Sequence, residues 1–173
     1  MVEHFPNQKH QEAMPVKEQP PMKMDKLFDV YAEERGALKR KDISRGDEFA
    51  RRRQEFFNDA RKRYQDPENR ESVLKGFEQG VMRGMSNEDV HLAIEIVGGE
   101  EMNHIVKNVL DSMGMDEQWT LVMDTGEEVQ VSENPVDYDK DFSQYIIRYH
   151  LKGSHVGKVA PISSFISHIR RER

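Results

Sequence analysis

Residues 118–131, QWTLVMDTGEEVQV, mark the point at which the chain changes from helical to strand periodicity. Apolar residues in this stretch alternate with polar ones, at Trp119, Leu121, Met123, Val129 and Val131. An alternation of period two is typical of a strand with one buried face, and Asp124-Thr-Gly126 supplies the residues of a tight turn. The stretch therefore predicts a β-hairpin.

Upstream of the hairpin, three segments carry apolar residues at the spacing of an amphipathic helix. The positions are Val73, Phe77, Val81, Val90, Ala93, Ile94, Val97, Met102, Ile105, Val106, Val109, Leu110 and Met113. Asp66-Pro67 suits the start of the first segment, and Ser86 with Asp89 resembles a capping pair for the second. Glycines follow each segment, so we predict three short helices.

Downstream of the hairpin, the pattern predicts two more strands and a final helix. A polar loop containing Asn134-Pro135 leads to a strand over residues 143–151, and a fourth strand runs through Val156 and Val159. Ser163 is a candidate cap for a C-terminal helix. Helices first and strands afterwards indicate the α+β class, with a four-stranded, mostly antiparallel sheet.

Residues 25–66 form a basic amphipathic arm in front of this body. Leu27, Tyr31, Glu34 and Leu38 recur at helical spacing, and a stronger stripe follows at Phe49, Arg53, Phe56, Phe57, Ala60 and Tyr64. Gly46 and a candidate cap at Ser44 predict a break near residues 43–46. Unbroken, the arm would be about 60 Å long. Either it folds back on itself or it reaches another molecule.

The predicted organisation is therefore an extended tail over 1–24, the arm over 25–66 and an α+β body over 67–173. The tail contains Pro6, Pro15, Pro20 and Pro21 and has no apolar periodicity. We expect the body to fold without the arm, and the arm to be needed for assembly.

Charge is strongly segregated along the chain, although the net charge is only -6. Residues 35–63 hold eleven Lys and Arg against five acids, whereas residues 85–144 hold fifteen acids against two lysines. Such asymmetry bears on partners rather than on fold.

The composition narrows the compartment and the class of protein. The chain has no cysteine, so it can hold no disulfide and no thiolate metal site. No stretch has the roughly 20 apolar residues of a membrane span, and the first residues lack a secretory-signal pattern. We expect no membrane partner, and a cytoplasmic location or one within a virus particle.

Four motifs resemble catalytic or binding signatures, and each has a simpler structural interpretation. Asp124-Thr-Gly126 is similar to the aspartic-protease triplet, but Glu127 and Glu128 follow it where that family has a small residue, and a hairpin turn explains it. Gly153-Ser-His-Val-Gly157-Lys158 is one residue too short for a phosphate loop.

The other two motifs lie on the predicted helices. His91 with Glu95, and Glu101 with His104, resemble steps of a carboxylate-bridged metal bundle, but they make only part of the required set. The helix pair over 87–113 resembles a helix-turn-helix, but its second helix is acidic and would be repelled by DNA phosphate. We expect no catalytic residue, no metal and no cofactor.

The arm remains as the candidate binding element. The leading interpretation is a non-enzymatic structural or adaptor subunit of a homo- or hetero-oligomeric assembly, such as a virion component. Its expected apolar anchors are Phe49, Phe56, Phe57 and Tyr64, and its expected electrostatic positioners are Arg51, Arg52, Arg61 and Arg63.

Two alternatives remain open. A nucleic-acid-binding accessory protein would use the three basic clusters of the arm, which are Lys39, Arg40 and Lys41, then Arg51, Arg52 and Arg53, then Arg61, Lys62 and Arg63. An inhibitor whose acidic body imitates nucleic-acid charge would instead use the segment 85–144.

Overall fold

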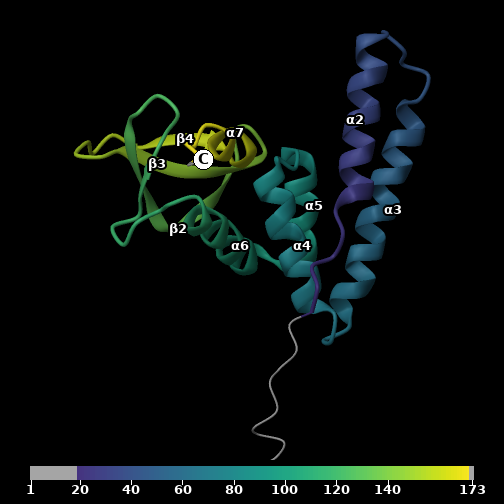
Figure 1. Ribbon diagram of the computed structural model, residues 1–173, viewed down its shortest axis with the longest axis horizontal. Helices are drawn as coiled ribbons and strands as arrows, with labels where there is room; N and C mark the ends of the chain where they lie inside the picture. Colours follow the sequence, from purple (N-terminus) through teal and green to yellow (C-terminus); the bar gives the residue numbers. More distant parts are fainter. Residues whose placement is uncertain (1–18, 172–173) are drawn as a thin grey trace, which may run out of the picture.

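The computed structural model describes residues 19–171 and confirms the α+β class. Figure 1 shows a pair of long helices beside a body of shorter helices and a curved sheet. The helices are α2 (Asp25–Lys39), α3 (Gly46–Gln65), α4 (Arg70–Arg83), α5 (Asn87–Val97), α6 (Gly99–Ser112) and α7 (Ile162–Ser167). The strands are β1 (Thr120–Val122), β2 (Glu128–Asp139), β3 (Gln144–Leu151) and β4 (Lys158–Pro161).

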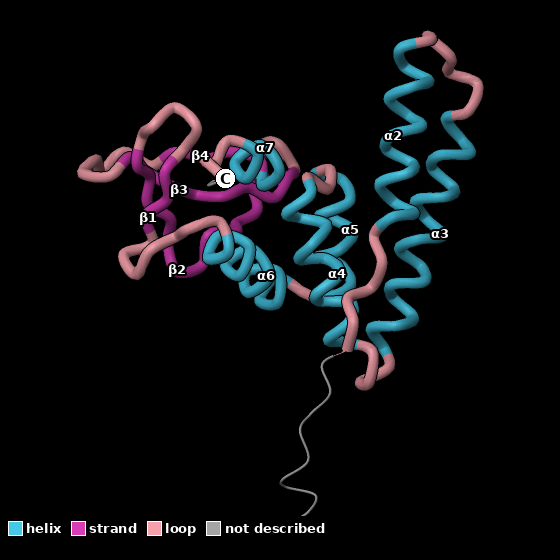
Figure 2. Tube along the Cα trace, in the orientation of Figure 1, coloured by secondary structure: helices cyan, strands magenta, loops and turns pink. Residues whose placement is uncertain are grey.

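The arm folds back on itself. Helices α2 and α3 pack side by side as a hairpin, joined by residues 40–45, and the joined end rises beyond α4 and α5 (Figure 2). The predicted break is therefore confirmed. The cap prediction is wrong: Arg45 occupies the N-cap of α3, and the Ser44 hydroxyl donates to Asp42 Oδ1 at 2.6 Å instead.

The three predicted body helices are confirmed as α4, α5 and α6. Ser86 caps α5, because its Oγ accepts from the backbone N–H of Asp89 at 3.3 Å. The first helix starts later than predicted, at Arg70. Asp66 accepts from the backbone N–H of Glu68 and so forms a separate turn before the helix begins.

The sheet is a meander in the order β1-β2-β3-β4, and all its pairings are antiparallel. The predicted loop at Asn134-Pro135 is wrong, because β2 continues through it. Val131 pairs with Tyr149 and Val136 with Ile147, so four residues of β2 bulge opposite one residue of β3. Proline lacks the N–H of a ladder residue and is tolerated in a bulge, which bends the strand.

The C-terminal helix closes the sheet. The fourth strand starts at Lys158, two residues after the predicted Val156, and leads directly into α7. Ser163 lies inside α7 and donates to the Met85 carbonyl, so it does not cap the helix. The chain then crosses to the outer edge of β1, where the N–H of Arg170 donates to the Val122 carbonyl at 2.8 Å.

One core joins the arm to the body. Leu27 of α2 and Phe57 and Ala60 of α3 belong to the same buried cluster as residues of α4, α5, α6, the sheet and α7. The Phe57 and Phe77 rings, from α3 and α4, have centroids 6.3 Å apart. The shared core changes the expectation that the body folds alone, since removing the arm would expose its apolar face to water.

Residues 19–24, within the predicted tail, pack onto α4. Met22 and Met24 are buried, and the N–H of Met22 donates to the Ser72 carbonyl at 2.8 Å. A Cβ on Gly76 would lie 2.8 Å from Met22 Cβ, so the glycine permits this close approach. The rest of the predicted tail, residues 1–18, lies outside the described residues.

Candidate functional site

The four aromatic residues expected to anchor a partner are used inside the chain. Phe49 is 5% exposed and packs with Val30 and Ala37 between the two helices of the hairpin. Phe57 is fully buried, while Phe56 and Tyr64 are half-buried against the main core. The stripe therefore holds α3 to this chain, and Phe49 and Phe57 offer no surface to a partner.

The arginines expected to position a partner are mostly paired with acids of the hairpin itself. Arg51 Nη1 lies 2.7 Å from Glu55 Oε1, and Arg63 Nε lies 2.9 Å from Asp59 Oδ2. Arg52 pairs with Glu33 of α2, and Arg61 donates to Asn58 at 3.3 Å. Exposed pairs of this kind contribute about 0–1 kcal/mol, so they neutralise the arm without greatly stabilising it.

Arg53 connects the hairpin to the body. Its Nη2 lies 2.7 Å from Asp89 Oδ1 and 3.1 Å from Glu88 Oε2, both on α5. Burial lowers the pKa of Arg53, but the hydrogen bonds and charge of Asp89 outweigh it and raise the pKa overall. Arg53 is therefore a partly buried cation that is paired within the chain rather than a free binding group.

Tyr31 completes the connection from α2. Its hydroxyl donates to Asp89 Oδ2 and accepts from the backbone N–H of Ser86 at 3.2 Å. Burial and the bond to Asp89 raise the pKa of Tyr31, so the phenol stays protonated. In an ordinary capping box the side chain of Asp89 would accept from the backbone N–H of Ser86. Tyr31 takes that role here, so the carboxylate of Asp89 is available to Arg53.

The tip of the hairpin, residues 37–46, differs from the rest of the arm. Lys39, Arg40 and Lys41 are exposed, and none of them forms an ion pair in the part of the chain that the structure describes. The tip holds four basic residues and one acid, a formal charge of +3. Arg45, the fourth, pairs with Glu48 at 2.9 Å, so the cations free to meet an outside partner are those of residues 39–41.

A specific backbone turn presents these cations. The N–H of Asp42 donates to the Ala37 carbonyl at 2.8 Å and that of Lys41 to the Leu38 carbonyl at 3.0 Å. Lys41 has a φ of 54°, so it occupies the left-handed position that glycine usually takes in this helix-ending motif. A lysine here keeps a charge at the tip at a conformational cost of about 1 kcal/mol.

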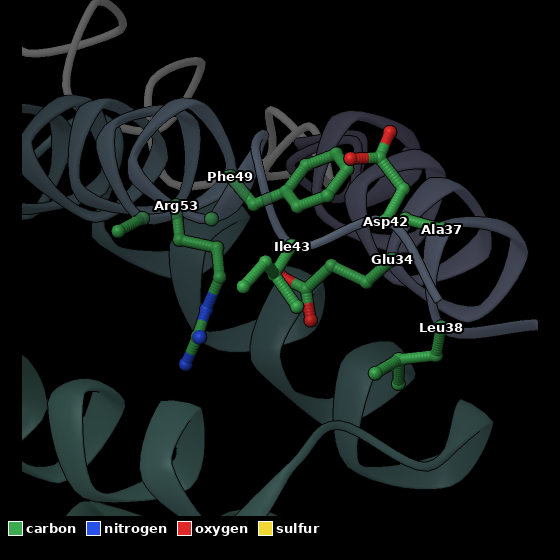
Figure 3. A pocket seen from close by; sticks show the side chains of 9 residues that line it. Glu34, Ala37, Leu38, Asp42, Ile43, Phe49 and Arg53 are labelled. Atoms are coloured by element: carbon green, nitrogen blue, oxygen red, sulfur yellow. The ribbon is translucent and has the colours of Figure 1, made fainter. Parts of the chain in front are cut away.

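An apolar groove lies beside the free cations. It has a volume of about 300 Å³ and is lined by Glu34, Ala37, Leu38, Asp42, Ile43, Gly46, Phe49, Ala50 and Arg53. Leu38 is 72% exposed and Ile43 is 90% exposed. Figure 3 shows Ile43 and Glu34 side by side between Leu38 and Arg53. Two large aliphatic side chains in water beside a groove mark a surface suited to a protein partner.

The two exposed residues are those that sequence reasoning missed. Leu38 continues the predicted helical stripe of α2, but the buried positions are Leu27, Val30 and Ala37, and Leu38 faces outward. Ile43 lies in the predicted break between the two helices of the arm. A large aliphatic residue in an otherwise polar connection was the one feature of the sequence that could have identified the tip.

The three basic clusters do not form one face. The residues at 39–41 lie at the joined end of the hairpin, whereas those at 61–63 lie about 24 Å away along the axis of α3. The middle cluster, Arg51, Arg52 and Arg53, pairs with Glu55, Glu33 and Asp89. The three clusters therefore do not make one basic surface, and the cluster at 39–41 is the one that adjoins the apolar groove.

The motif residues also have structural roles. Asp124 lies in the β1–β2 turn, and its Oδ2 is 3.1 Å from His168 Nδ1 rather than from a second carboxylate. His91 Nε2 is 3.2 Å from Glu95 Oε1 on the surface of α5. Within residues 19–171 no group of three or more His, Cys, Asp or Glu side chains could hold a metal ion. The helix pair over 87–113 packs with the apolar faces of both α5 and α6 in the core.

The remaining surfaces are less distinctive. Acids of the sheet pair with basic residues there, as Asp137 does with Arg148 at 2.6 Å and Glu128 with Lys152 at 3.6 Å. Strand β4 is short and contains Lys158 and Pro161, and these features oppose pairing of its edge with a strand of another chain. No helix between residues 19 and 171 is long and apolar enough to cross a membrane.

Comparison of the chain with protein-family models, with curated proteins and with solved structures gives no match. The site must therefore be interpreted from its own chemistry.

Proposed function

We propose that this protein is a non-enzymatic structural or adaptor subunit that binds a neighbouring protein through the tip of its helical hairpin. The observation that carries the proposal is the exposure of Leu38 and Ile43 next to the groove at the projecting end of α2 and α3. Burial of two aliphatic side chains contributes about 1.5–3 kcal/mol each when they leave water completely. Association at the tip thus gains from the burial of both side chains.

The shape of the molecule supports an adaptor. The joined end of the hairpin rises beyond α4 and α5, so a neighbour can approach it without meeting the body (Figure 1). The middle of α3 is fixed to the body by Phe57 and by the bond between Arg53 and Asp89. A binding surface that projects from a firmly attached hairpin holds the bound neighbour in a defined position relative to the body. A virus particle or a cytoplasmic complex provides such neighbours.

The proposal is tested on the full chain, tagged and isolated from its source cells. A native mass above the 20.3 kDa of one chain is expected, with slower hydrogen exchange at residues 37–46 in the complex than in the free protein. A protein that is monomeric in the cell extract, or a complex that protects a different region, would contradict the proposal.

Binding to nucleic acid through the tip is the second candidate, and Lys39, Arg40 and Lys41 favour it. Phe49 of the adjoining groove is too buried to stack on a base, however, and the exposed side chains of the groove, Leu38 and Ile43, are aliphatic and offer phosphate no hydrogen-bond donor. Titration with single- and double-stranded DNA and RNA at low salt decides between the two. We expect only weak, salt-sensitive binding.

The third candidate is an inhibitor that imitates nucleic-acid charge. It depends on the acidic segment 85–144, in which Asp89 is buried and Asp137 and Glu128 are paired with basic residues. Competition by the whole protein against a nucleic-acid-binding enzyme would test it, and we expect none.

A further inference from the structure

The groove at the tip is lined by residues of α2, of α3 and of the connection between them. Two helices form its sides, and the small residues Ala37, Gly46 and Ala50 leave room between them. A Cβ added to Gly46 would meet no atom within 4 Å, so the space above this residue is open. A third helix can approach closely where the residues beneath it are small, since side chains at the contact set the distance between helices.

The exposed aliphatic residues supply the anchors that such a helix needs. Leu38 lies in the last turn of α2 and Ile43 in the connection, so they flank the groove from two directions (Figure 3). An amphipathic helix presents apolar residues at every third or fourth position and places them in a groove of this kind. The chemistry of the groove therefore requires an apolar stripe on its partner.

The charge around the groove sets the polar flank of that partner. Lys39, Arg40 and Lys41 form a free basic rim. Of the two acids of the groove, Asp42 accepts from the N–H and hydroxyl of Ser44 at 3.0 and 2.6 Å, and Glu34 interacts electrostatically with Arg53. Carboxylates of a partner are thus attracted by the rim, whereas basic residues are repelled.

We propose that the groove between the ends of α2 and α3 receives an amphipathic helix of a partner protein whose polar flank is rich in Asp and Glu. The proposal rests on the proposed function and specifies the chemistry of its partner. A second copy of this chain fits less well, because two tips of formal charge +3 repel each other.

The experiment measures the fluorescence anisotropy of labelled 18-residue peptides titrated with the full-length protein. Three peptides share one leucine stripe at helical spacing, and their flanks carry Glu, Lys or Gln. A fourth peptide is a scrambled Glu peptide with the same composition and no stripe, which separates the effect of charge from that of the stripe. Circular dichroism establishes that the three striped peptides have equal helicity.

We expect the Glu peptide to bind at least tenfold more tightly than the Gln peptide and the scrambled peptide, and the Lys peptide not to bind. The double variant Leu38→Ser/Ile43→Ser should weaken binding of the Glu peptide at least tenfold. The control variant Val156→Ser/Val159→Ser, which changes two exposed apolar residues near β4, should leave it unchanged.

Three results would overturn the inference. They are equal binding of the Glu and scrambled peptides, binding that survives the tip variant, and an absence of peptide binding. Loss of self-association in the tip variant would assign the groove to a second copy, and tighter binding of DNA or RNA there would assign it to nucleic acid. If the tip is protected in the native complex but the Glu peptide fails, the proposed function stands and only the partner chemistry is wrong.

Discussion

The guanidinium of Arg53 donates to the carboxylate of Asp89 over 2.7 Å, and Asp89 has 0% exposure. The two residues are 36 positions apart in the sequence and join α3 to α5. Because Tyr31 of α2 bonds to the same carboxylate, one buried acid holds both helices of the hairpin. The direction of the hairpin relative to the body therefore depends on this cluster as well as on the apolar core.

Substitution of Arg53 by Leu should destabilise the protein by about 2–3 kcal/mol. Removal of one partner leaves the carboxylate of Asp89 buried without a counter-charge, and the cost is at the lower end for such a change because Tyr31 still donates to it. Arg51→Leu is the matched control, because Arg51 pairs with Glu55 on the surface and should cost below about 1 kcal/mol. Urea denaturation measures both, and equal costs would contradict the role of the buried pair.

Substitution of Gly76 by Ala should destabilise the protein by about 1–3 kcal/mol, the range for overpacking. The new Cβ would meet the Cβ of Met22 at 2.8 Å and its backbone oxygen at 2.9 Å, so the chain over residues 19–24 must move. Gly80→Ala meets the terminal methyl of Met24, which can rotate away, and should cost less. Thermal unfolding compares them. A Gly76→Ala protein as stable as the wild type would show that this segment does not belong to the core.

Substitution of Lys41 by Gly should stabilise the protein by about 0.5–1 kcal/mol. The φ of 54° costs a lysine energy that glycine avoids, although glycine also gains more entropy in the unfolded chain. Lys39→Gly is the control, because Lys39 is the last helical residue of α2, where glycine should destabilise the protein slightly. Opposite shifts of the melting temperature are expected. Shifts of the same sign would contradict the turn described at the tip.

Asp137 should make stability depend on pH in the acid range. The hydrogen bond from Arg148, with a second from the N–H of Tyr138, lowers the pKa of the Asp137 carboxyl below its usual value. The unfolded chain then binds more protons than the native one, so this stabilisation is present above about pH 3.9 and is lost as the pH falls through the native pKa.

Asp137→Asn should therefore cost less than about 1 kcal/mol at pH 7, because the pair is half exposed, and the difference from wild type should narrow below about pH 3.9. Glu133→Gln, an exposed acid on the same strand, is the control and should show no such trend. Urea denaturation at pH 7 and pH 3 measures the change. A difference that widens in acid would contradict the assigned sign.

Helices α4, α5 and α6 could be predicted because their signals are local. Glycines follow each segment, and Ser86 caps α5 as its position indicated. The bulge of β2 could not be predicted in this way. Pro135 indicates a loop when only its neighbours are considered, and the pairing of Val136 with Ile147 depends on a distant strand.

The binding surface proposed from the structure lies on the same arm that the sequence indicated, but at other residues. The aromatic stripe at Phe49 and Phe57 indicated an apolar face, but the sequence does not state whether such a face meets this chain or another. Leu38 and Ile43 became visible as a surface once the fold of the hairpin showed which apolar positions the core leaves uncovered.

The most direct test of the tip as the binding site compares two double variants in the native complex isolated from source cells. Leu38→Ser/Ile43→Ser changes the tip, and Val156→Ser/Val159→Ser changes exposed residues elsewhere; neither should lower stability much, because all four side chains are exposed. Native mass measurement should show the tip variant as a free chain of about 20.3 kDa and the control variant in the wild-type complex. A tip variant that assembles as the wild type does would contradict the account.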